Sequence, residues 1–215
     1  MSVPYNKTFE QVVKSKRSLP NFSNEIPPID LLNEIVKSCI HAPYAGALGM
    51  PLNEVRKIYI FKQGTESMTI ARDILLSEIK KNSRKIYAIL KFLPFLRKKA
   101  KPFAYRLRVF SPKGIPLLFE APFFIVIAEK KGFPMVNEES LTHALQNMWL
   151  TATNLGLEFQ LITAIPHMAN NKQFLKLLKL KKGDYALDGC VVGYPYNHAK
   201  ESKDYEFEKF VTWVE

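Results

Sequence analysis

The sequence has few of the residues that metal sites, disulfide frameworks and hydrolytic active sites require. Its 215 residues include two cysteines and four histidines, and no set of them has metal-ligand spacing. Both cysteines lie in apolar surroundings, so we expect two buried thiols in a reducing cytoplasm. No G-x-S-x-G segment marks a hydrolase nucleophile, and no glycine-rich loop between a strand and a helix predicts a Rossmann or P-loop fold.

Long apolar segments are also missing. The longest uninterrupted apolar run, around residues 123–128, has the length of a strand, whereas a membrane-spanning helix needs about 20 apolar residues. The N-terminal residues lack the apolar core of a signal peptide. A chain of this size buries enough surface to fold without disulfide bonds or a structural metal ion. We therefore expect a soluble, cytoplasmic protein with a single domain over residues 1–215.

Negative charge is missing from one segment. Residues 80–108 contain no Asp or Glu, whereas the rest of the chain carries 20 basic and 20 acidic residues. The segment therefore accounts for the whole net charge of +11. Its eleven cations are Lys80, Lys81, Arg84, Lys85, Lys91, Arg97, Lys98, Lys99, Lys101, Arg106 and Arg108. We predict a basic helical excursion at about 80–113.

Four interpretations of this basic segment stay open. A solvated helical face is the simplest. A more specific interpretation is a docking surface for an acidic electron-transfer protein, such as a ferredoxin or flavodoxin, because complementary charge accelerates the encounter of two proteins. A membrane-surface helix is less favoured, although apolar residues lie between the cations. Nucleic acid is least favoured, because neither aromatic platforms nor a groove-entering motif accompany the charge.

Apolar periodicity predicts helices interspersed with a few strands, an α+β fold. Leu141, Ala144, Leu145 and Met148 form one stripe of a helix that we expect to begin near Asn137, its N-cap. Gly156 suits the C-terminus of that helix, where positive φ is common. Further helices are expected at 8–16, 29–40, 66–93 and 171–180. Strands are expected at 56–61, 121–129, 159–164 and 186–195.

Two further expectations concern apolar residues near the chain ends. In the first helix we expect Phe9, Val12 and Val13 to point inward. The polar C-terminal tail ends in Phe207, Phe210, Val211 and Trp213, so we expect it to be anchored on another surface.

Three segments carry residues that suit a binding site. Residues 15–22, SKRSLPNF, place two cations and a hydroxyl in a turn that could hold a phosphate by charge-assisted hydrogen bonds. Residues 41–52, HAPYAGALGMPL, form a bare loop that a flat ligand or another chain can approach closely. Gln146 and Asn147 put two amides in the middle of an otherwise apolar helix. The alternatives are that the first segment is a solvated turn, the second a plain loop and the third part of a core helix.

Taken in order, five segments resemble the motifs of a known family. They comprise Lys16, Arg17, Ser18 and Phe22; Ala42, Pro43, Ala45, Gly46 and Pro51; Ala121 and Pro122; Gln146, Asn147, Leu150, Ala152, Leu155, Gly156 and Leu157; and Gly193, Tyr194 and Pro195. These are similar to R-R-S-x-R-x-F, A-P-S-A-G-N-x-Q-P-W, A-P, Q-N-x-x-L-A-A-x-x-L-G-L and G-Y-P of the nitroreductase family of FMN-dependent oxidoreductases. The resemblance spans nearly the whole chain.

The resemblance implies a fold and an activity. The fold would be a central mixed, mostly antiparallel sheet flanked by helices, within an intertwined homodimer. The activity would be an FMN-dependent transfer of hydride or electrons from NADH or NADPH to an electron-poor acceptor, such as a nitroaromatic or a quinone. The alternatives are a degenerate, non-catalytic flavin-binding relative and an enzyme reduced by an acidic electron-transfer protein.

The resemblance also implies the cofactor-binding residues. The cluster of Lys16, Arg17 and Ser18 would hold the FMN phosphate, with Lys200 and Lys203 as a second clamp. The loop of Pro43, Tyr44, Ala45, Gly46 and Ala47 would approach the cofactor of the partner subunit. Thr163 and Ala164 would offer backbone donors near the flavin N5. Because the cofactor carries the chemistry, no catalytic acid or base and no metal is implied.

Three departures from the family pattern weaken the implied flavin contacts. Pro20 stands where the second motif arginine would be, and Ala47 stands where an asparagine would bind the ring. The Q-P-W segment is replaced by G-M-P-L, with one residue inserted. Each loss removes a polar contact, so we expect weaker FMN binding or substitute contacts from Tyr44.

Overall fold

A computed structural model describes residues 8–17, 21–44, 49–92, 120–133, 135–197 and 205–214. Its centre is a four-stranded sheet in the order β1-β2-β4-β3. The strands are β1 (Arg56–Lys62), β2 (Phe123–Lys130), β3 (Glu158–Leu161) and β4 (Tyr185–Gly193). All three strand pairs are antiparallel. The predicted α+β class is confirmed, and within the described residues the sheet has no parallel pair.

The central strand β2 divides the interior into two cores. Its seven residues from Phe123 to Glu129 are all buried, as expected for a continuously apolar strand covered on both faces. Because side chains alternate along a strand, Phe124 and Val126 join one core while Ile125 and Ile127 join the other.

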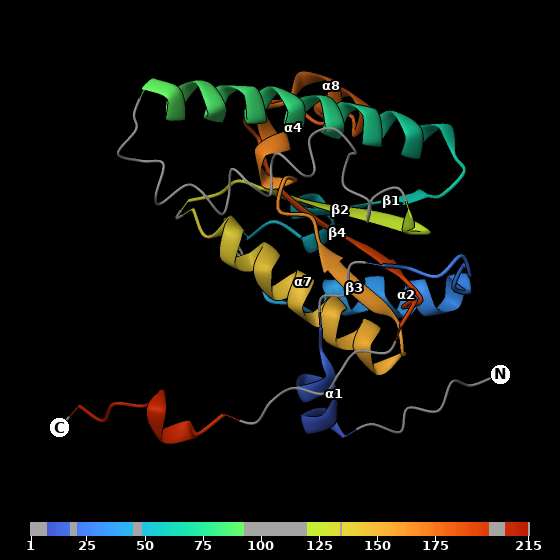
Figure 1. The fold of residues 1–215 in the computed structure, drawn as a ribbon, viewed down its shortest axis with the longest axis vertical. Helices are drawn as coiled ribbons and strands as arrows, with labels where there is room; N and C mark the ends of the chain where they lie inside the picture. The colour runs from blue at the N-terminus through green and yellow to red at the C-terminus, as the bar shows by residue number, and fades with distance from the viewer. Residues whose placement is uncertain are drawn as a thin grey trace.

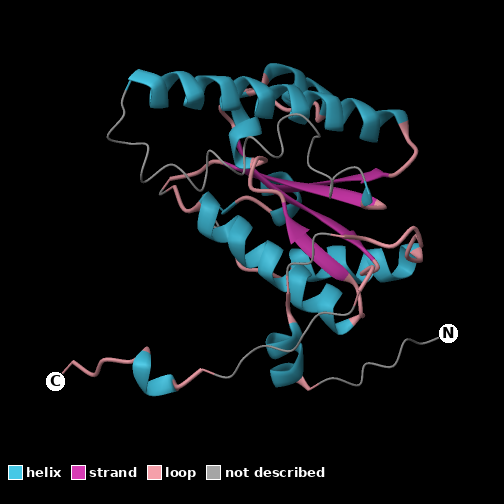
Figure 2. Cartoon of the chain, in the orientation of Figure 1, coloured by secondary structure: helices cyan, strands magenta, loops and turns pink. Residues whose placement is uncertain are grey.

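Helices cover both faces of the sheet (Figures 1 and 2). One face is covered by α4 (Glu66–Phe92) and α8 (Lys172–Leu177), and the other by α2 (Ile29–Ile40) and α7 (Asn137–Asn154). The short elements are α1 (Phe9–Ser15), α3 (Leu52–Val55), η3 (Pro166–Asn170) and η4 (Phe207–Lys209). Figure 1 places α4 and α1 on opposite sides of the sheet.

The predicted stripe of α7 is confirmed. Leu141, Ala144, Leu145 and Met148 are all buried against the sheet and α2. Gly156 has a φ of +74°, and the adjacent Leu157 amide donates to the Ala152 carbonyl, which closes the helix C-terminus.

Asn137 is not the N-cap of α7, contrary to the expectation. Val136 occupies the cap position and Asn137 is the first helical residue. The Asn137 side-chain amide instead donates to the Lys130 carbonyl at 2.6 Å. The asparagine therefore ties the start of α7 to the end of β2.

Several apolar side chains that the periodicity placed inward are exposed. In α1 only Val12 is buried, whereas Phe9 is 74% and Val13 47% exposed. Phe210 and Trp213 of the C-terminal segment are also exposed, and Figure 1 shows this segment apart from the body of the protein. The described tail residues are thus exposed in the single chain, and their anchoring on another surface stays a prediction.

Residues 80–92 of the predicted basic excursion lie in α4. Helix α4 is described from Glu66 to Phe92, and Leu93, the predicted last residue, lies outside the described residues. Residues 93–113, the remainder of the predicted excursion, lie outside the described residues. Of the helices that the structure describes, none is long and apolar enough to cross a membrane.

Three of the sequence motifs meet at one end of the sheet. Phe22 forms an isolated antiparallel bridge with Pro195, and the Ser23 amide donates to the Tyr194 carbonyl at 2.9 Å. A Cβ on Gly193 would lie 2.6 Å from Pro122 Cδ and 2.8 Å from Phe22 Cδ1. Glycine at this position therefore lets the segment after Arg17, the start of β2 and the end of β4 pack together.

We predict that Gly193→Ala destabilises the protein by ~1–3 kcal/mol, the usual effect of overpacking a tight core. Urea unfolding followed by circular dichroism measures the change. Asn24→Ala, at an exposed position close by in the sequence, is the control and should change the free energy of unfolding by less than ~0.5 kcal/mol. Equal stabilities for Gly193→Ala and the unsubstituted protein would contradict the packing.

Candidate functional site

The two predicted phosphate-binding cations lie directly after α1. A capping box between Thr8 and Gln11 starts this helix, and Lys16 ends it, its backbone amide donating to the Val12 carbonyl. Arg17 follows and donates from Nη1 to the Lys16 carbonyl. The short helix thus places both cations side by side in the chain, at a half-buried position.

Lys16 reaches the amide-bearing part of α7. Its Nζ donates to Gln146 Oε1 at 3.0 Å and lies 4.2 Å from the centre of the Trp149 ring. Trp149 in turn stacks on Phe159 of β3 at a centroid distance of 5.4 Å. Burial lowers the pKa of Lys16 from its usual value, since a desolvated ammonium is less stable. An anionic group placed beside Lys16 would favour its charged form.

The second amide of α7 has a different partner. Asn147 Nδ2 donates to the Ser38 carbonyl of α2 at 3.3 Å. Of the two amides that stood out in the sequence, Gln146 therefore positions a site cation and Asn147 joins two helices of the same layer.

The loop after α2 is held by a buried arginine, Arg56. Its Nε and Nη2 each donate to Glu129 Oε2 at 2.9 Å, and both side chains are at most 1% exposed. Arg56 and Glu129 are also direct cross-strand neighbours in β1 and β2. The ion pair therefore lies at the edge between the sheet and the α2–α7 layer.

The remaining donors of Arg56 bind the backbone that leads into the predicted cofactor loop. Nη1 donates to the carbonyls of Cys39 at 2.7 Å and Ala42 at 3.4 Å, and Nη2 donates to that of Pro43 at 3.3 Å. Nη2 also donates to Ser140 Oγ of α7 at 2.9 Å, and this hydroxyl donates to the Pro43 carbonyl. One guanidinium thus fixes the end of α2 and the first residues of the loop.

Tyr44 continues this loop. Its hydroxyl donates to the Met50 carbonyl at 3.3 Å, which bridges the two sides of the segment between them. The predicted site residues Ala45, Gly46 and Ala47 lie within that segment and outside the described residues. The loop is therefore held at both described ends, by Arg56 on one side and Tyr44 on the other.

Thr163 and Ala164, predicted to offer backbone donors, form a turn between β3 and η3. The flanking residues are fixed, because the Ile162 amide donates to the Gly189 carbonyl and the Ile165 amide donates to the Ile162 carbonyl. Within the described part of the chain, the amides of Thr163 and Ala164 donate no hydrogen bond.

The predicted site residues that the structure describes form three groups along the chain. Ser18, Lys200 and Lys203 lie outside the described residues, as does Pro20. For the residues that are described, no hydrogen bond joins the Lys16–Arg17 pair, the Pro43–Tyr44 loop and the Thr163–Ala164 turn to one another. Each group is held separately on the shared scaffold.

Neither cysteine is suited to nucleophilic chemistry. Cys39 and Cys190 are free and buried. Burial raises the pKa of Cys39 to about 11, an effect that Arg56 partly offsets, and raises the pKa of Cys190 well above its usual value. Both therefore stay as neutral thiols near neutral pH. The described residues contain no cluster of His, Cys, Asp and Glu that could hold a metal ion.

Sequence reasoning missed Arg56, Glu129 and Trp149. A signal for the ion pair does exist, since Arg56 begins a strand and Glu129 follows a run of six apolar residues. Only the register between these strands shows that the two charges are opposite each other. Trp149 lies outside the apolar stripe of α7, and nothing in the sequence relates it to Lys16.

Comparisons with known proteins agree on the fold. The family model of the Nitroreductase family matches residues 13–194. A nitroreductase with bound FMN from Bacteroides fragilis has a TM-score of 0.69 at 18% identity, with 98% of this chain and 100% of that chain covered. No curated protein matches the sequence.

Two further solved structures widen the comparison. A nitroreductase with bound FMN from Desulfitobacterium hafniense has a TM-score of 0.66 at 20% identity, covering 96% of this chain and 98% of that one. An oxidized iodotyrosine deiodinase bound to FMN and 3-iodo-L-tyrosine has a TM-score of 0.65 at 20% identity. The match covers 97% of this chain and 100% of that chain. At such identities these structures establish the shared fold.

We predict that Arg56→Met lowers the free energy of unfolding by ~3–5 kcal/mol, because it leaves the Glu129 carboxylate buried without its partner. Replacing both residues, as Arg56→Met with Glu129→Leu, should cost less than the single change. Lys209→Met, in the exposed ion pair with Glu206, is the control and should cost under ~1 kcal/mol. A double variant less stable than Arg56→Met would contradict this account.

Proposed function

The chain belongs to the nitroreductase family of flavin-dependent oxidoreductases, and from this premise we propose that it binds FMN and transfers electrons from NADH or NADPH to a small acceptor. The observation that carries the proposal is the half-buried cation pair after α1, at the start of the region that matches the family. The cofactor would supply the hydride and electron chemistry, while the chain supplies position and electrostatics.

The donors of this chain fit the parts of FMN. Lys16 and Arg17 would bind the phosphate, since charge-assisted hydrogen bonds to phosphate are strong and Gln146 already orients the Lys16 ammonium. The amides of Thr163 and Ala164, which donate no hydrogen bond among the described residues, would donate to the polar edge of the flavin ring. Pro43 and Tyr44 would approach the cofactor of a second subunit, on the loop that Arg56 holds.

The acceptor we propose is a nitroaromatic or a quinone. Solved structures of this fold include nitroreductases and an iodotyrosine deiodinase with bound 3-iodo-L-tyrosine, so the fold serves more than one acceptor. A flavin-binding relative without turnover is the second candidate, because Pro20 and Ala47 replace two polar ligands of the family pattern. Reduction by an acidic electron-transfer protein is a further alternative.

We also propose that the protein is a homodimer in the cytoplasm. Several large apolar side chains of α1, α2 and the C-terminal segment are exposed, which is unusual for a surface that stays in water. They are Phe9 (74%), Ile29 (58%), Phe207 (65%), Phe210 (71%) and Trp213 (83%). A second copy would cover them and bring its loop to the cofactor. The two free, buried thiols fit a reducing compartment.

Visible absorbance tests the proposal. The purified protein, with FMN added, should retain bound flavin after gel filtration, lose its visible absorbance with NADH or NADPH, and regain it with a quinone. A protein without flavin that also takes up none would overturn the flavin assignment. Bound flavin that neither nucleotide reduces would instead support the non-catalytic candidate or a protein donor.

We predict that Lys16→Ala and Arg17→Ala each weaken FMN binding about tenfold to a hundredfold, from the loss of hydrogen bonds to a charged group. Fluorescence titration measures the dissociation constant. Riboflavin, which lacks the phosphate, is the matched ligand, and the same two substitutions should weaken its binding much less than that of FMN. Lys14→Ala, on the exposed side of α1, is the control variant. Equal losses for riboflavin and FMN would mean that these cations do not bind the phosphate.

We predict that sedimentation at micromolar concentration gives twice the 24.7 kDa mass of one chain. Phe210→Ser with Trp213→Ser should shift the protein towards the monomer, because both side chains would lose an apolar partner surface. Ile70→Ser, on α4 and 40% exposed, is the control and should leave the mass unchanged. A monomer that still binds flavin would count against the dimer.

A further inference from the structure

The C-terminal end of α4 extends beyond the core. The buried residues of this helix end at Ser83, and none of residues 84–92 is buried. At 1.5 Å per residue this end is about 13 Å long. Figure 1 shows it reaching past the sheet, on the side opposite α1. The exposed side chains of this helix end can contact another surface.

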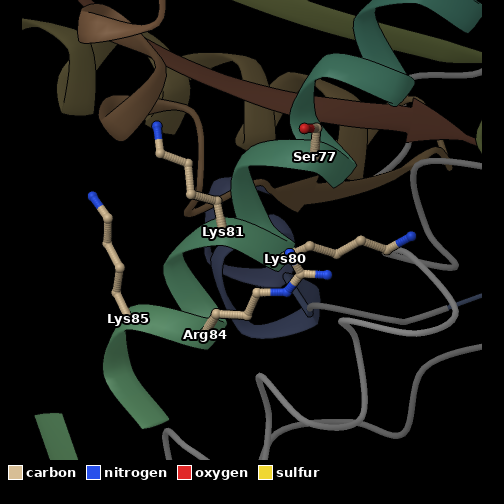
Figure 3. A pocket seen from close by; sticks show the side chains of 5 residues that line it. All are labelled: Ser77, Lys80, Lys81, Arg84 and Lys85. Atoms are coloured by element: carbon tan, nitrogen blue, oxygen red, sulfur yellow. The ribbon is translucent and has the colours of Figure 1, made fainter. Parts of the chain in front are cut away.

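The outer side of this helix is basic. Lys80, Lys81, Arg84 and Lys85, with Ser77, line a shallow hollow of about 520 Å³. Figure 3 shows Lys81 and Lys85 extending to one side of the helix and Lys80 and Arg84 to the other. Residues 79–92 contain no acidic residue, so the charge along this stretch is uniform in sign.

Helix α8 adds to the same layer. Asn171, which caps α8, donates from Nδ2 to Glu78 Oε2 of α4 at 3.0 Å and so joins the two helices. Five exposed lysines lie on and after α8, and they are Lys172, Lys176, Lys179, Lys181 and Lys182. The fold therefore enlarges the basic surface beyond the segment that stands out in the sequence.

Exposed apolar side chains lie among the cations at the helix end. Phe92 is 78%, Ile89 50% and Tyr87 40% exposed. A solvated basic helix does not need these side chains, whereas a helix that lies in the interface of a bilayer combines cations with aromatic and aliphatic residues.

We propose that the C-terminal half of α4, supported by α8, binds the surface of an anionic lipid bilayer. The cations attract the phosphate-bearing headgroups, and Phe92 and Ile89 enter the boundary with the acyl chains. An acidic redox protein fits less well, because a partner on this surface would be across the sheet from the cations after α1 (Figure 1). Binding to a bilayer does not itself require bound flavin, and only the comparison with a redox protein uses the cations after α1.

Vesicle flotation with the full chain tests the proposal. The probes are vesicles of phosphatidylcholine alone and of phosphatidylcholine with 40 mol% phosphatidylglycerol. We expect binding to the anionic vesicles at 0.05 M salt and a steep loss as salt rises, because the Debye length shortens to about 8 Å at physiological ionic strength. No preference for the anionic vesicles would overturn the proposal.

Charge variants localise the binding. Arg84→Gln with Lys85→Gln should weaken binding to anionic vesicles by about 25-fold, at about fivefold per cation. Lys37→Gln with Lys209→Gln removes the same charge from α2 and η4 and should weaken binding by less than about threefold, because these cations lie outside the surface. Equal losses for the two double variants would mean that net charge, rather than this surface, drives binding.

An apolar variant separates a lipid surface from an acidic protein. Phe92→Ala should reduce vesicle binding by about tenfold, because a largely exposed ring loses its burial in lipid, while flavin content stays unchanged. Tyr196→Ala, 69% exposed elsewhere, is its control. Vesicle binding that is unaffected by Phe92→Ala would overturn the proposal. The proposal would also be overturned if the protein bound an acidic flavodoxin through Arg84 and Lys85 but did not bind anionic vesicles.

Discussion

The buried ion pair between Arg56 and Glu129 joins more of the structure than any other interaction described above. It links β1 to β2 across the sheet, and it extends to the end of α2 and to Ser140 of α7. Two charges taken out of water are costly unless their hydrogen-bonding capacity is used. Arg56 meets that condition with a carboxylate, a hydroxyl and three carbonyls. Among the described residues, Glu129 Oε1 has no hydrogen-bond partner, so we infer that the pair contributes more to positioning than to stability.

That positioning fixes the start of the segment that carries several candidate site residues. The carbonyls of Ala42 and Pro43 are held by the guanidinium, so the loop leaves α2 in a defined direction. Lys16 is oriented in a comparable way by Gln146 and Trp149 of α7. Both groups of candidate residues therefore depend on α7, which packs on the sheet through its apolar stripe and on α2 through Asn147.

The sequence predicts the parts of this structure that periodicity and local chemistry determine. The apolar run of β2, the stripe of α7 and the glycine after it were all predicted, since each depends on residues close together in the chain. The Arg56–Glu129 pair was not, because the partners are 73 residues apart and only strand register makes them neighbours. Periodicity was wrong about Phe9 and Val13, because it identifies an apolar side chain and does not identify the surface that covers it.

The charges around exposed apolar residues distinguish those surfaces from one another. Phe9 is followed by Glu10, Ile29 by Asp30, and Phe207 lies between Glu206 and Glu208, with Lys14 and Lys209 close by. A surface with charges of both signs suits contact with a second copy, where opposite charges can pair around an apolar centre. On α4, Ile89 and Phe92 have only cations near them in the sequence, because residues 79–92 carry no carboxylate. Two copies of that surface would repel each other, so the partner that we propose for the apolar residues of α4 is anionic, whereas the partner that we propose for those of α1 and the tail is a second copy.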